Sequence, residues 1–137
     1  MKFYIDTAIW LDFLEDRKGY LGEPIGKYAG ELFKNILFNK DTIIVSTLLI
    51  NELKIKCSFG QINSMFKPFE KRMYIVRYTF EQSLEARKLV VERDLPKGDA
   101  LHAILARDEK AILIARDNHF KKLRDICQYY KPENFII

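Results

Sequence analysis

The sequence predicts a three-layer α/β domain in which helices cover both faces of a parallel sheet. Short apolar runs that suit buried strands alternate with longer segments that carry a helical spacing of apolar residues. The strongest signal is residues 97–120, which predict a helix, a turn, a strand at 111–115 and a second helix. This strand is apolar on both faces and follows a helix that is apolar all round, as expected of a central parallel strand. Ligands bind beyond the carboxyl ends of such strands, so Asp117, where this strand ends, marks a candidate site.

The elements are assigned from local signals along the chain. Clustered aromatic and β-branched residues favour strands, apolar residues recurring every three or four positions favour helices, and Gly and Pro mark the breaks. In the first half the expected elements are a strand at 2–6, a helix at 8–16 capped by Thr7, a turn at 18–24, a helix at 25–37, a strand at 42–45 and a helix from 47 to 57. In the second half they are a short helix at 60–67 ended by Pro68, a strand at 73–76, a helix at 80–95, a break at 95–98, a helix opened by Asp99, the strand at 111–115, a helix after Asp117, a strand at 127–130, a turn at 131–134 and a packed tail at 135–137.

Length and composition exclude several classes of protein. A chain of 137 residues without an internal linker predicts one domain spanning 1–137. The net charge of +4 is only a weak indication of a polyanionic partner. Cys57 and Cys127 lack a second Cys or His at ligand spacing, so free thiols are expected rather than a disulfide or a zinc site. With no signal peptide and no apolar run long enough to cross a bilayer, we expect a cytoplasmic protein without a membrane partner.

Four carboxylates fall at strand ends or at the start of adjacent helices: Asp6, Glu52, Asp99 and Asp117. Three of them stand in apolar surroundings, where burying a carboxylate costs kilocalories unless it is paired or bound to a metal. Several buried carboxylates together repel one another and need a cation to stay ionised. Oxygen ligands without a His or Cys at ligand spacing suit Mg²⁺ or Mn²⁺. The pattern therefore predicts a divalent metal site at one mouth of the sheet.

Each acid alone also has a purely structural explanation. Asp6 or Asp117 could cap a helix, Glu52 could pair with a neighbouring lysine, and Asp99 could interact with the dipole of its helix. These explanations are at least as good as the functional one for any single residue. Their joint placement at strand ends favours the metal site.

Several other residues have ordinary interpretations. His102 lies one turn past Asp99 and could face the site, although a partly buried histidine bonded to the backbone is the preferred interpretation. His119 is expected to lie on the surface, where it could contact RNA. Asp12 is expected on the solvated side of the first helix. Six basic residues flank the last acidic segment, where they form either a solvated face or a set of phosphate contacts. They are Arg107, Lys110, Arg116, Lys121, Lys122 and Arg124.

The chain resembles the PIN domain family, and within it the single-domain VapC-type toxin ribonucleases. The resemblance lies in four separated segments in order, IDTAIWLDFL, STLLINELKIK, GDALHAILAR and LIARDNHF, and in the closing YYKPENFI. It covers nearly the whole chain. It implies a five-stranded parallel sheet of order 3-2-1-4-5 and an acidic site formed by Asp6, Glu52, Asp99 and Asp117.

The resemblance also implies a function. The expected protein is a Mg²⁺-dependent (or Mn²⁺-dependent) endoribonuclease, the toxin of a toxin–antitoxin pair, that acts on RNA as a homodimer and is inhibited by an antitoxin protein. Asp6, Asp99 and Asp117 would be metal ligands, and Glu52 would complete the set or orient a water. No Ser-His-Asp, Cys-His or Gly-rich phosphate motif is apparent, so an activated water is the expected nucleophile.

One departure from the family keeps other functions open. Ala115 stands two residues before the last acid, where the family often has Thr or Ser, whereas Thr7 keeps a hydroxyl that could orient Asp6. This departure motivates the alternative of a non-catalytic RNA-binding or scaffold domain. A metal-dependent phosphatase or receiver-like domain is a further alternative, but the sequence shows no convincing Lys opposite a nucleophilic Asp.

Overall fold

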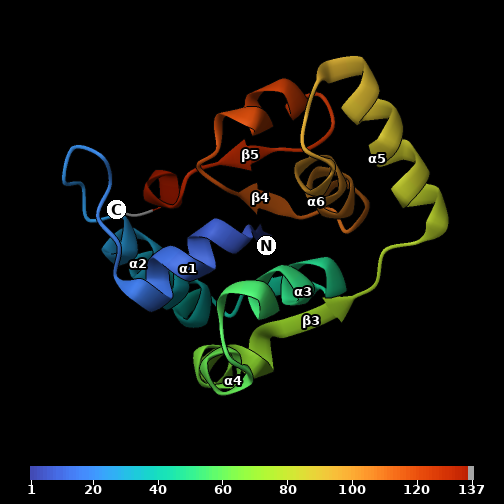
Figure 1. Cartoon of the computed structure of the whole chain (residues 1–137). Helices are drawn as coiled ribbons and strands as arrows, with labels where there is room; N and C mark the ends of the chain where they lie inside the picture. Colours follow the sequence, from blue (N-terminus) through green and yellow to red (C-terminus); the bar gives the residue numbers. More distant parts are fainter. Residues whose placement is uncertain (136–137) are drawn as a thin grey trace.

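A computed structural model describes residues 1–135 and contains a five-stranded parallel sheet of order β3-β2-β1-β4-β5 (Figure 1). This confirms the strand order that the family resemblance implies. The strands are β1 (Lys2–Ile5), β2 (Thr42–Ser46), β3 (Met73–Val76), β4 (Ile112–Ile114) and β5 (Tyr129–Tyr130). The helices are α1 (Thr7–Glu15), α2 (Ile25–Asn39), α3 (Thr47–Lys56), α4 (Phe59–Phe66), α5 (Phe80–Arg93) and α6 (Lys97–Asp108), with 3₁₀ turns η1 (Lys67–Arg72), η2 (Asn118–Leu123) and η3 (Pro132–Phe135).

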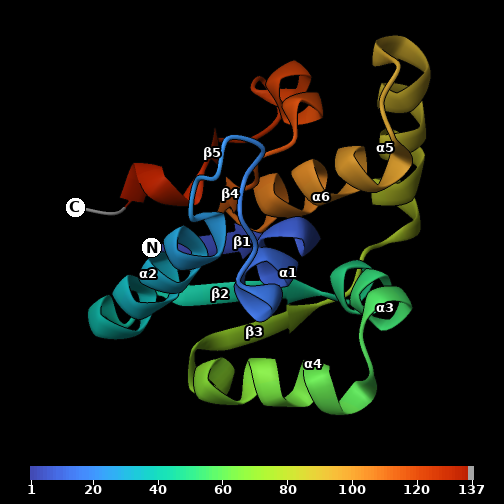
Figure 2. The same cartoon turned by 60° about the vertical axis from the view of Figure 1, so that its left-hand side comes forward.

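The sheet separates two cores, because successive strand residues point to opposite faces. On β1, Phe3 and Ile5 pack with α1 to α4, whereas Tyr4 packs with α5 and α6. On β2, Ile43 and Ile44 divide in the same way. Figure 1 and Figure 2 show the two sets of helices on opposite sides of the sheet. The strands are therefore covered on both faces, as the continuous apolar runs predicted.

The centre of the sheet sets the position of the acidic residues. β1 lies between β2 and β4, and the Asp6 N–H donates to the carbonyl oxygen of Ile114 at 2.9 Å. The first residue after β1 is therefore tied to the end of β4. Since all neighbouring strands are parallel, their carboxyl ends share one edge of the sheet.

Aromatic side chains fill the core beneath α1. Trp10 is fully buried, and its ring centroid lies 4.5 Å from that of Phe33, 4.9 Å from Phe66 and 6.0 Å from Phe69. The indole Nε1 of Trp10 is buried without a hydrogen-bond partner among the described residues. Trp10 is thus a packing residue held by size rather than by its polar atom.

Several element predictions need correction. Asp6, not Thr7, is the N-cap of α1, and α6 begins at Lys97, with Asp99 in its first turn. The short helix predicted at 60–67 is confirmed as α4, which ends at Phe66 before Pro68, and the chain then continues as the 3₁₀ turn η1 with the proline in its first turn, where its missing N–H is not needed. The predicted helix after Asp117 is the 3₁₀ turn η2, and the last strand is confined to Tyr129–Tyr130.

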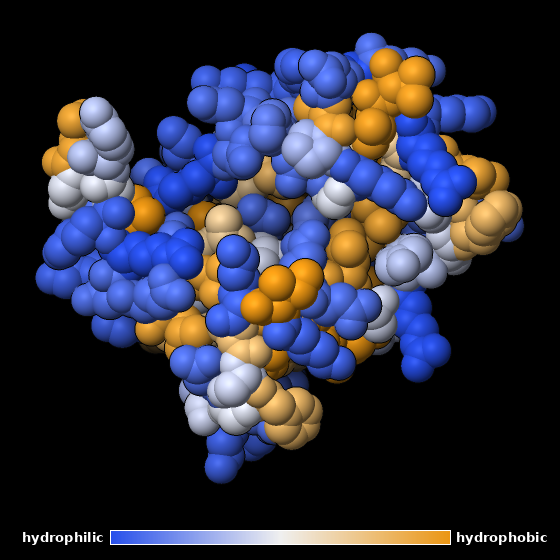
Figure 3. Space-filling model, in the orientation of Figure 1, coloured by the Kyte–Doolittle hydropathy of each residue, from blue (hydrophilic) through white to orange (hydrophobic). Residues whose placement is uncertain are grey.

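The predicted tail at 135–137 is described only at its first residue. The Phe135 ring packs edge-on against Phe3 and Tyr130, with 5.4 Å between centroids in each case. Residues 136–137 lie outside the described residues. Within the described chain, no helix combines the length and apolarity that crossing a bilayer requires. Hydrophobic side chains on the face seen in Figure 3 form separate groups among hydrophilic ones.

We expect Gly26→Ala to destabilise the fold by about 1–3 kcal/mol, because an added methyl group would overpack the contact between α1 and α2. A Cβ at Gly26 would lie 2.6 Å from the Asp16 Cα, 2.7 Å from the Asp12 carbonyl oxygen and 2.8 Å from the Arg17 nitrogen, all backbone atoms. The control is Gly30→Ala on the same helix, where the nearest atom is a Phe13 ring carbon at 3.6 Å. That change should be neutral or stabilising by about 0.5–1 kcal/mol. Urea unfolding measures both, and equal midpoints for the two variants would contradict the close approach.

Candidate metal centre

The carboxyl edge of the sheet brings the four predicted acids to one end of the molecule. Asp6 directly follows β1, Asp117 follows β4, Glu52 lies on the helix that leaves β2, and Asp99 is in the first turn of α6. They form two groups. Asp6 and Glu52 surround His102 in the interior, and Asp99 and Asp117 surround His119 nearer the surface.

The inner group is built around a buried histidine. The His102 side chain is 1% exposed, and its Nε2 lies 2.9 Å from Glu52 Oε1 and 3.9 Å from Asp6 Oδ1. The Thr7 hydroxyl donates to the same Glu52 oxygen. Because an ionised carboxylate only accepts hydrogen bonds, Nε2 of His102 must be a donor. Glu52 is therefore held by two donors from different elements.

A chain of hydrogen bonds fixes the His102 ring from behind. Nδ1 of His102 lies 2.6 Å from the Tyr4 hydroxyl, which lies 2.6 Å from the Ser46 hydroxyl. The Leu49 N–H donates to Ser46 Oγ at 3.0 Å. In the neutral imidazole Nδ1 accepts, so Tyr4 donates to His102 and Ser46 donates to Tyr4. Tyr4 and Ser46 lie on neighbouring central strands, so the sheet itself orients the ring that holds Glu52.

The outer group has the spacing of a cation site. Nδ1 of His119 lies 2.9 Å from Asp99 Oδ2 and 2.9 Å from Asp117 Oδ1. One ligand atom from each of these three residues lies within 4.8 Å of the others. Asp117 also accepts the backbone N–H of His119 at 2.9 Å, which makes it the N-cap of η2. The turn thus brings the histidine to the acids.

The electrostatics of the cluster favour a bound cation. Burial raises the pKa of Asp6 to about 6, with Asp99 and Glu52 adding to the rise and His102 opposing it. Burial and the nearby Asp117 also raise the pKa of Asp99, against the hydrogen bond from His119. For Glu52, burial is outweighed by the hydrogen bonds from His102 and Thr7, and its pKa is lowered. A divalent cation would relieve the repulsion between the crowded carboxylates.

Gly98 allows α6 to begin close to the inner group. A Cβ at this position would lie 3.0 Å from Glu52 Oε2. The next residue is Asp99, so the missing side chain lets the N-terminus of α6, and with it Asp99, approach Glu52. This close approach links the inner and outer groups.

Ala115 leaves Asp117 oriented by other atoms. Ala115 is fully buried, and its N–H donates to the Tyr130 carbonyl oxygen at 3.0 Å. The Tyr129 hydroxyl donates to the backbone oxygen of Asp117 at 3.4 Å. The backbone around Asp117 is therefore held by β5 and by its own cap, without a hydroxyl at position 115.

Three sequence-based interpretations in this region are wrong. His102 is fully buried and bonds to side chains, not to the backbone. The Thr7 hydroxyl holds Glu52, not Asp6. Asp12 is 4% exposed rather than solvated, with carboxylate oxygens 3.7 Å from nitrogens of Arg17 and Arg116. Asp12 therefore helps to position the segment before Asp117 through Arg116.

His119 is the site residue that the sequence interpretation missed. Its side chain is 45% exposed, in keeping with the expected surface position, but its ring nitrogen faces both acids. The available signal was its place two residues after Asp117, where a tight turn brings the two side chains together. Not all flanking basic residues are free to bind phosphate: Arg107 pairs with Glu85, and Arg116 with Glu133.

The donor set fits a hard divalent cation. Asp99 and Asp117, which lie at ligand spacing, offer the carboxylate oxygens that Mg²⁺ and Mn²⁺ prefer, and the charge of Asp99 also acts on Asp6. His119 adds an imidazole nitrogen, which transition-metal ions bind more readily than Mg²⁺ does. The site as a whole therefore suits a small divalent cation that is coordinated mainly by oxygen ligands.

Comparisons with known proteins agree on the fold. A family model described as PIN domain matches residues 3–126. None of the curated proteins matches the sequence significantly. Solved structures similar to this chain include VapBC2 from Rickettsia felis bound to a promoter DNA fragment, with a TM-score of 0.68, 19% identity and coverage of 96% of this chain and 98% of that chain.

Two further structures are similar over most of their length. A toxin–antitoxin complex from Klebsiella pneumoniae has a TM-score of 0.69, 16% identity and coverage of 98% of both chains. VapC20 from Mycobacterium tuberculosis, a toxin that cleaves the sarcin-ricin loop, has a TM-score of 0.61, 17% identity and coverage of 88% of this chain and 94% of that chain. At these identities the likeness concerns the fold alone.

Proposed function

This chain belongs to the PIN domain family, and we propose that it is a metal-dependent endoribonuclease that hydrolyses RNA phosphodiester bonds. The observation that supports this most is the gathering of Asp6, Glu52, Asp99 and Asp117 at one mouth of the sheet, together with two histidines. Structural roles of single residues, such as the cap that Asp117 provides for η2, do not explain why all four acids lie together. A cation that meets a phosphate at this mouth would account for them.

In this proposal the acids have separate roles. Asp6, Asp99 and Asp117 hold the cation, with His119 as an additional donor to it. Glu52, held by Thr7 and His102, completes the set or orients the attacking water. A bound Mg²⁺ or Mn²⁺ supplies Lewis-acid polarisation of the phosphate and an activated water. The buried His102 is a positioning residue, since it acts on the site through Glu52.

We further propose that the chain is the toxin of a toxin–antitoxin pair, a single PIN domain over 1–137 that works as a homodimer with a cognate antitoxin. Support comes from the similar structures, which include toxin–antitoxin complexes and a toxin that cleaves the sarcin-ricin loop. The edge strand β3 exposes Tyr74 and Ile75, each 59% exposed, and Phe80 nearby is 71% exposed. Exposed apolar side chains of this kind are what a protein partner covers.

A non-catalytic RNA-binding or scaffold domain is the second candidate. Ala115 favours it, because a hydroxyl donor near Asp117 is absent. RNA binding without turnover in any divalent metal would support this candidate.

We expect removal of divalent metal to abolish RNA cleavage and its return to restore it. The chain, dialysed against EDTA, is incubated with an end-labelled single-stranded RNA, and products are followed on a denaturing gel after addition of Mg²⁺ or Mn²⁺. Cleavage should depend on the metal because a divalent cation held by the carboxylates would offset the negative charge that develops on the phosphate. Folded protein that cleaves no RNA in either metal would refute the nuclease proposal. Hydrolysis of small phosphoesters but not of RNA would instead favour a phosphatase.

A further inference from the structure

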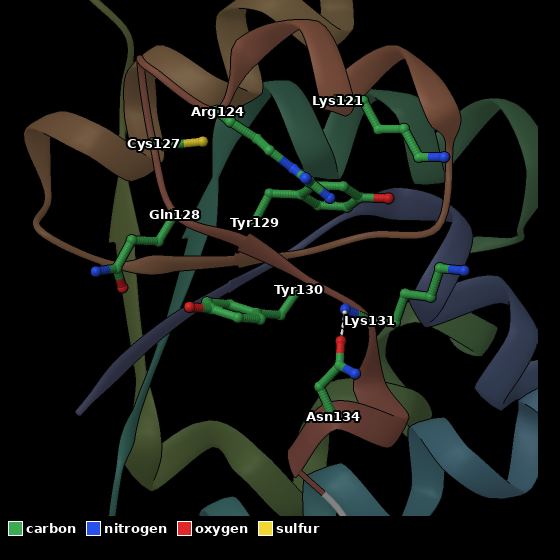
Figure 4. A pocket seen from close by; sticks show the side chains of 8 residues that line it. All are labelled: Lys121, Arg124, Cys127, Gln128, Tyr129, Tyr130, Lys131 and Asn134. Carbon is green, nitrogen blue, oxygen red and sulfur yellow. Dashed lines mark hydrogen bonds between the residues drawn. The ribbon is translucent and has the colours of Figure 1, made fainter.

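A pocket of about 570 Å³ lies along β5 (Figure 4), and none of the four acids of the candidate metal centre is among its lining residues. Lys121 on η2 and Arg124 just after η2 border the pocket on one side. Tyr129 and Tyr130 of β5, and Lys131 just after the strand, also line it. We call it the β5 pocket. Every charged side chain that lines it is a cation. Its lining therefore suits an anionic ligand.

The three cations of the β5 pocket are not neutralised within the described chain. Lys121, Arg124 and Lys131 form no salt bridge among residues 1–135. The acids nearest in sequence are engaged elsewhere, Asp125 by Arg93 and Glu133 by Arg116. Since neither acid is free to pair with Lys121, Arg124 or Lys131, these three cations are available to bind an anionic ligand.

The β5 pocket also offers flat surfaces. The Arg124 guanidinium lies 5.6 Å from the centroid of the Tyr129 ring. Tyr130 is 43% exposed, and Figure 4 shows its ring on the other side of the β5 ribbon from that of Tyr129. Exposed aromatic rings bind nucleic-acid bases by stacking, in grooves where cations follow the phosphates. The pocket combines both features.

The position of the β5 pocket connects it to the acidic mouth. The Tyr129 hydroxyl, which belongs to the pocket lining, lies 3.4 Å from the backbone oxygen of Asp117. Lys121 lies on η2, the turn that Asp117 caps. A strand of RNA cleaved at the acids would thus reach the pocket with its neighbouring nucleotides.

We infer that the β5 pocket binds the single-stranded RNA that flanks the cleaved bond, with Lys121, Arg124 and Lys131 holding phosphates and Tyr130 stacking on a base. The inference rests on the proposed function, since it names the part of the substrate that the same site takes. An acidic peptide is the competing ligand. RNA is favoured because β5 is only two residues long and offers an added peptide strand few main-chain groups, whereas cations and an exposed ring suit phosphates and bases.

The test measures RNA binding in EDTA, so that its outcome does not depend on cleavage. Fluorescence anisotropy follows a labelled single-stranded RNA of about 12 nucleotides across a range of salt concentrations. The variant K121A/R124A/K131A should bind at least about tenfold more weakly, and the slope of log K against log salt should fall by about 2, as expected for three lost phosphate contacts. The matched control is K56A/K67A/K71A, which removes three exposed lysines on α3 and η1 near β3, at the opposite edge of the sheet. It should bind as the parent does.

A second variant tests stacking separately from charge. Tyr130→Ala should weaken binding by about tenfold at every salt concentration, and Tyr130→Phe should not. Equal weakening by the two triple variants, or none by the β5 variant, would overturn the inference. A poly-glutamate peptide of similar length is the competing ligand in this test. If it bound as tightly as RNA, lost affinity in K121A/R124A/K131A and was unaffected by Tyr130→Ala, the pocket would belong to an acidic protein segment and the inference would be overturned. Pocket-dependent RNA binding by a chain that never cleaves would support RNA binding at the β5 pocket and refute the nuclease.

Discussion

We expect Asp99→Asn to lower metal-dependent RNA cleavage by about 10²–10⁴-fold, because a cation supplies several kcal/mol of charge stabilisation in the transition state. Asp99 interacts with both the inner and the outer group of the site. Its Oδ2 is 2.9 Å from His119 Nδ1, and its charge also acts on Asp6 and His102. The amide of Asn keeps the shape and can still accept from His119, but it is a poor ligand for a hard cation. Initial rates of cleavage at saturating Mn²⁺ measure the effect.

The same change should not weaken the metal-free fold. Burial and Asp117 raise the pKa of Asp99, so keeping this group ionised at neutral pH costs the folded state free energy, and Asn removes that cost. The EDTA-treated variant should therefore melt at the same temperature as the wild type or higher, and the rise in melting temperature on adding Mn²⁺ should be lost. Glu31→Gln, an exposed acid on α2, is the control and should keep both cleavage and the metal response. Cleavage by Asp99→Asn within a few-fold of the wild type would contradict the assigned ligand set.

Trp10→Ala should reduce the free energy of unfolding by about 3–5 kcal/mol, the cost of a large cavity in a packed core. The indole lies against three phenylalanine rings from α2, α4 and η1, so the void cannot close without moving several elements. Because Trp10 is the only tryptophan, unfolding of the variants is best followed by far-UV circular dichroism in urea.

Trp10→Phe is the matched comparison. It keeps an aromatic ring and removes the buried Nε1–H, which has no partner among the described residues. Relief of an unsatisfied donor is worth about 1–3 kcal/mol, so it should offset much of the lost packing. If both variants lost the same stability, the argument that Trp10 is held by size would fail.

The placement of the acids could be predicted from the sequence because the topology of a parallel sheet determines it. Asp6 and Asp117 each follow an apolar run, and the carboxyl ends of parallel strands share an edge. Their surroundings could not be predicted in the same way. The contact of His102 with Glu52 depends on how α6 rotates against α3, and its contact with Tyr4 depends on a strand far away in sequence.

Other misses have local causes. A cap residue at Asp117 suggested an α-helix, but its side chain bonds the N–H of His119 and its carbonyl oxygen accepts from Phe120, the short pattern of a 3₁₀ turn. Asp12 stands at a position of α1 that sequence spacing assigns to solvent. It is buried because Arg116 reaches it from beyond β4.

The division of the interior by the sheet has a consequence for the site. Glu52 stands on α3, which packs in one core, and Asp99 stands on α6, which packs in the other. The two helices meet at Glu52, where Gly98 allows a close approach and His102 bonds to the carboxylate. A cation bound by both acids would therefore link the two separately packed cores. Local unfolding of one core would then be coupled to local unfolding of the other in the metal-bound protein.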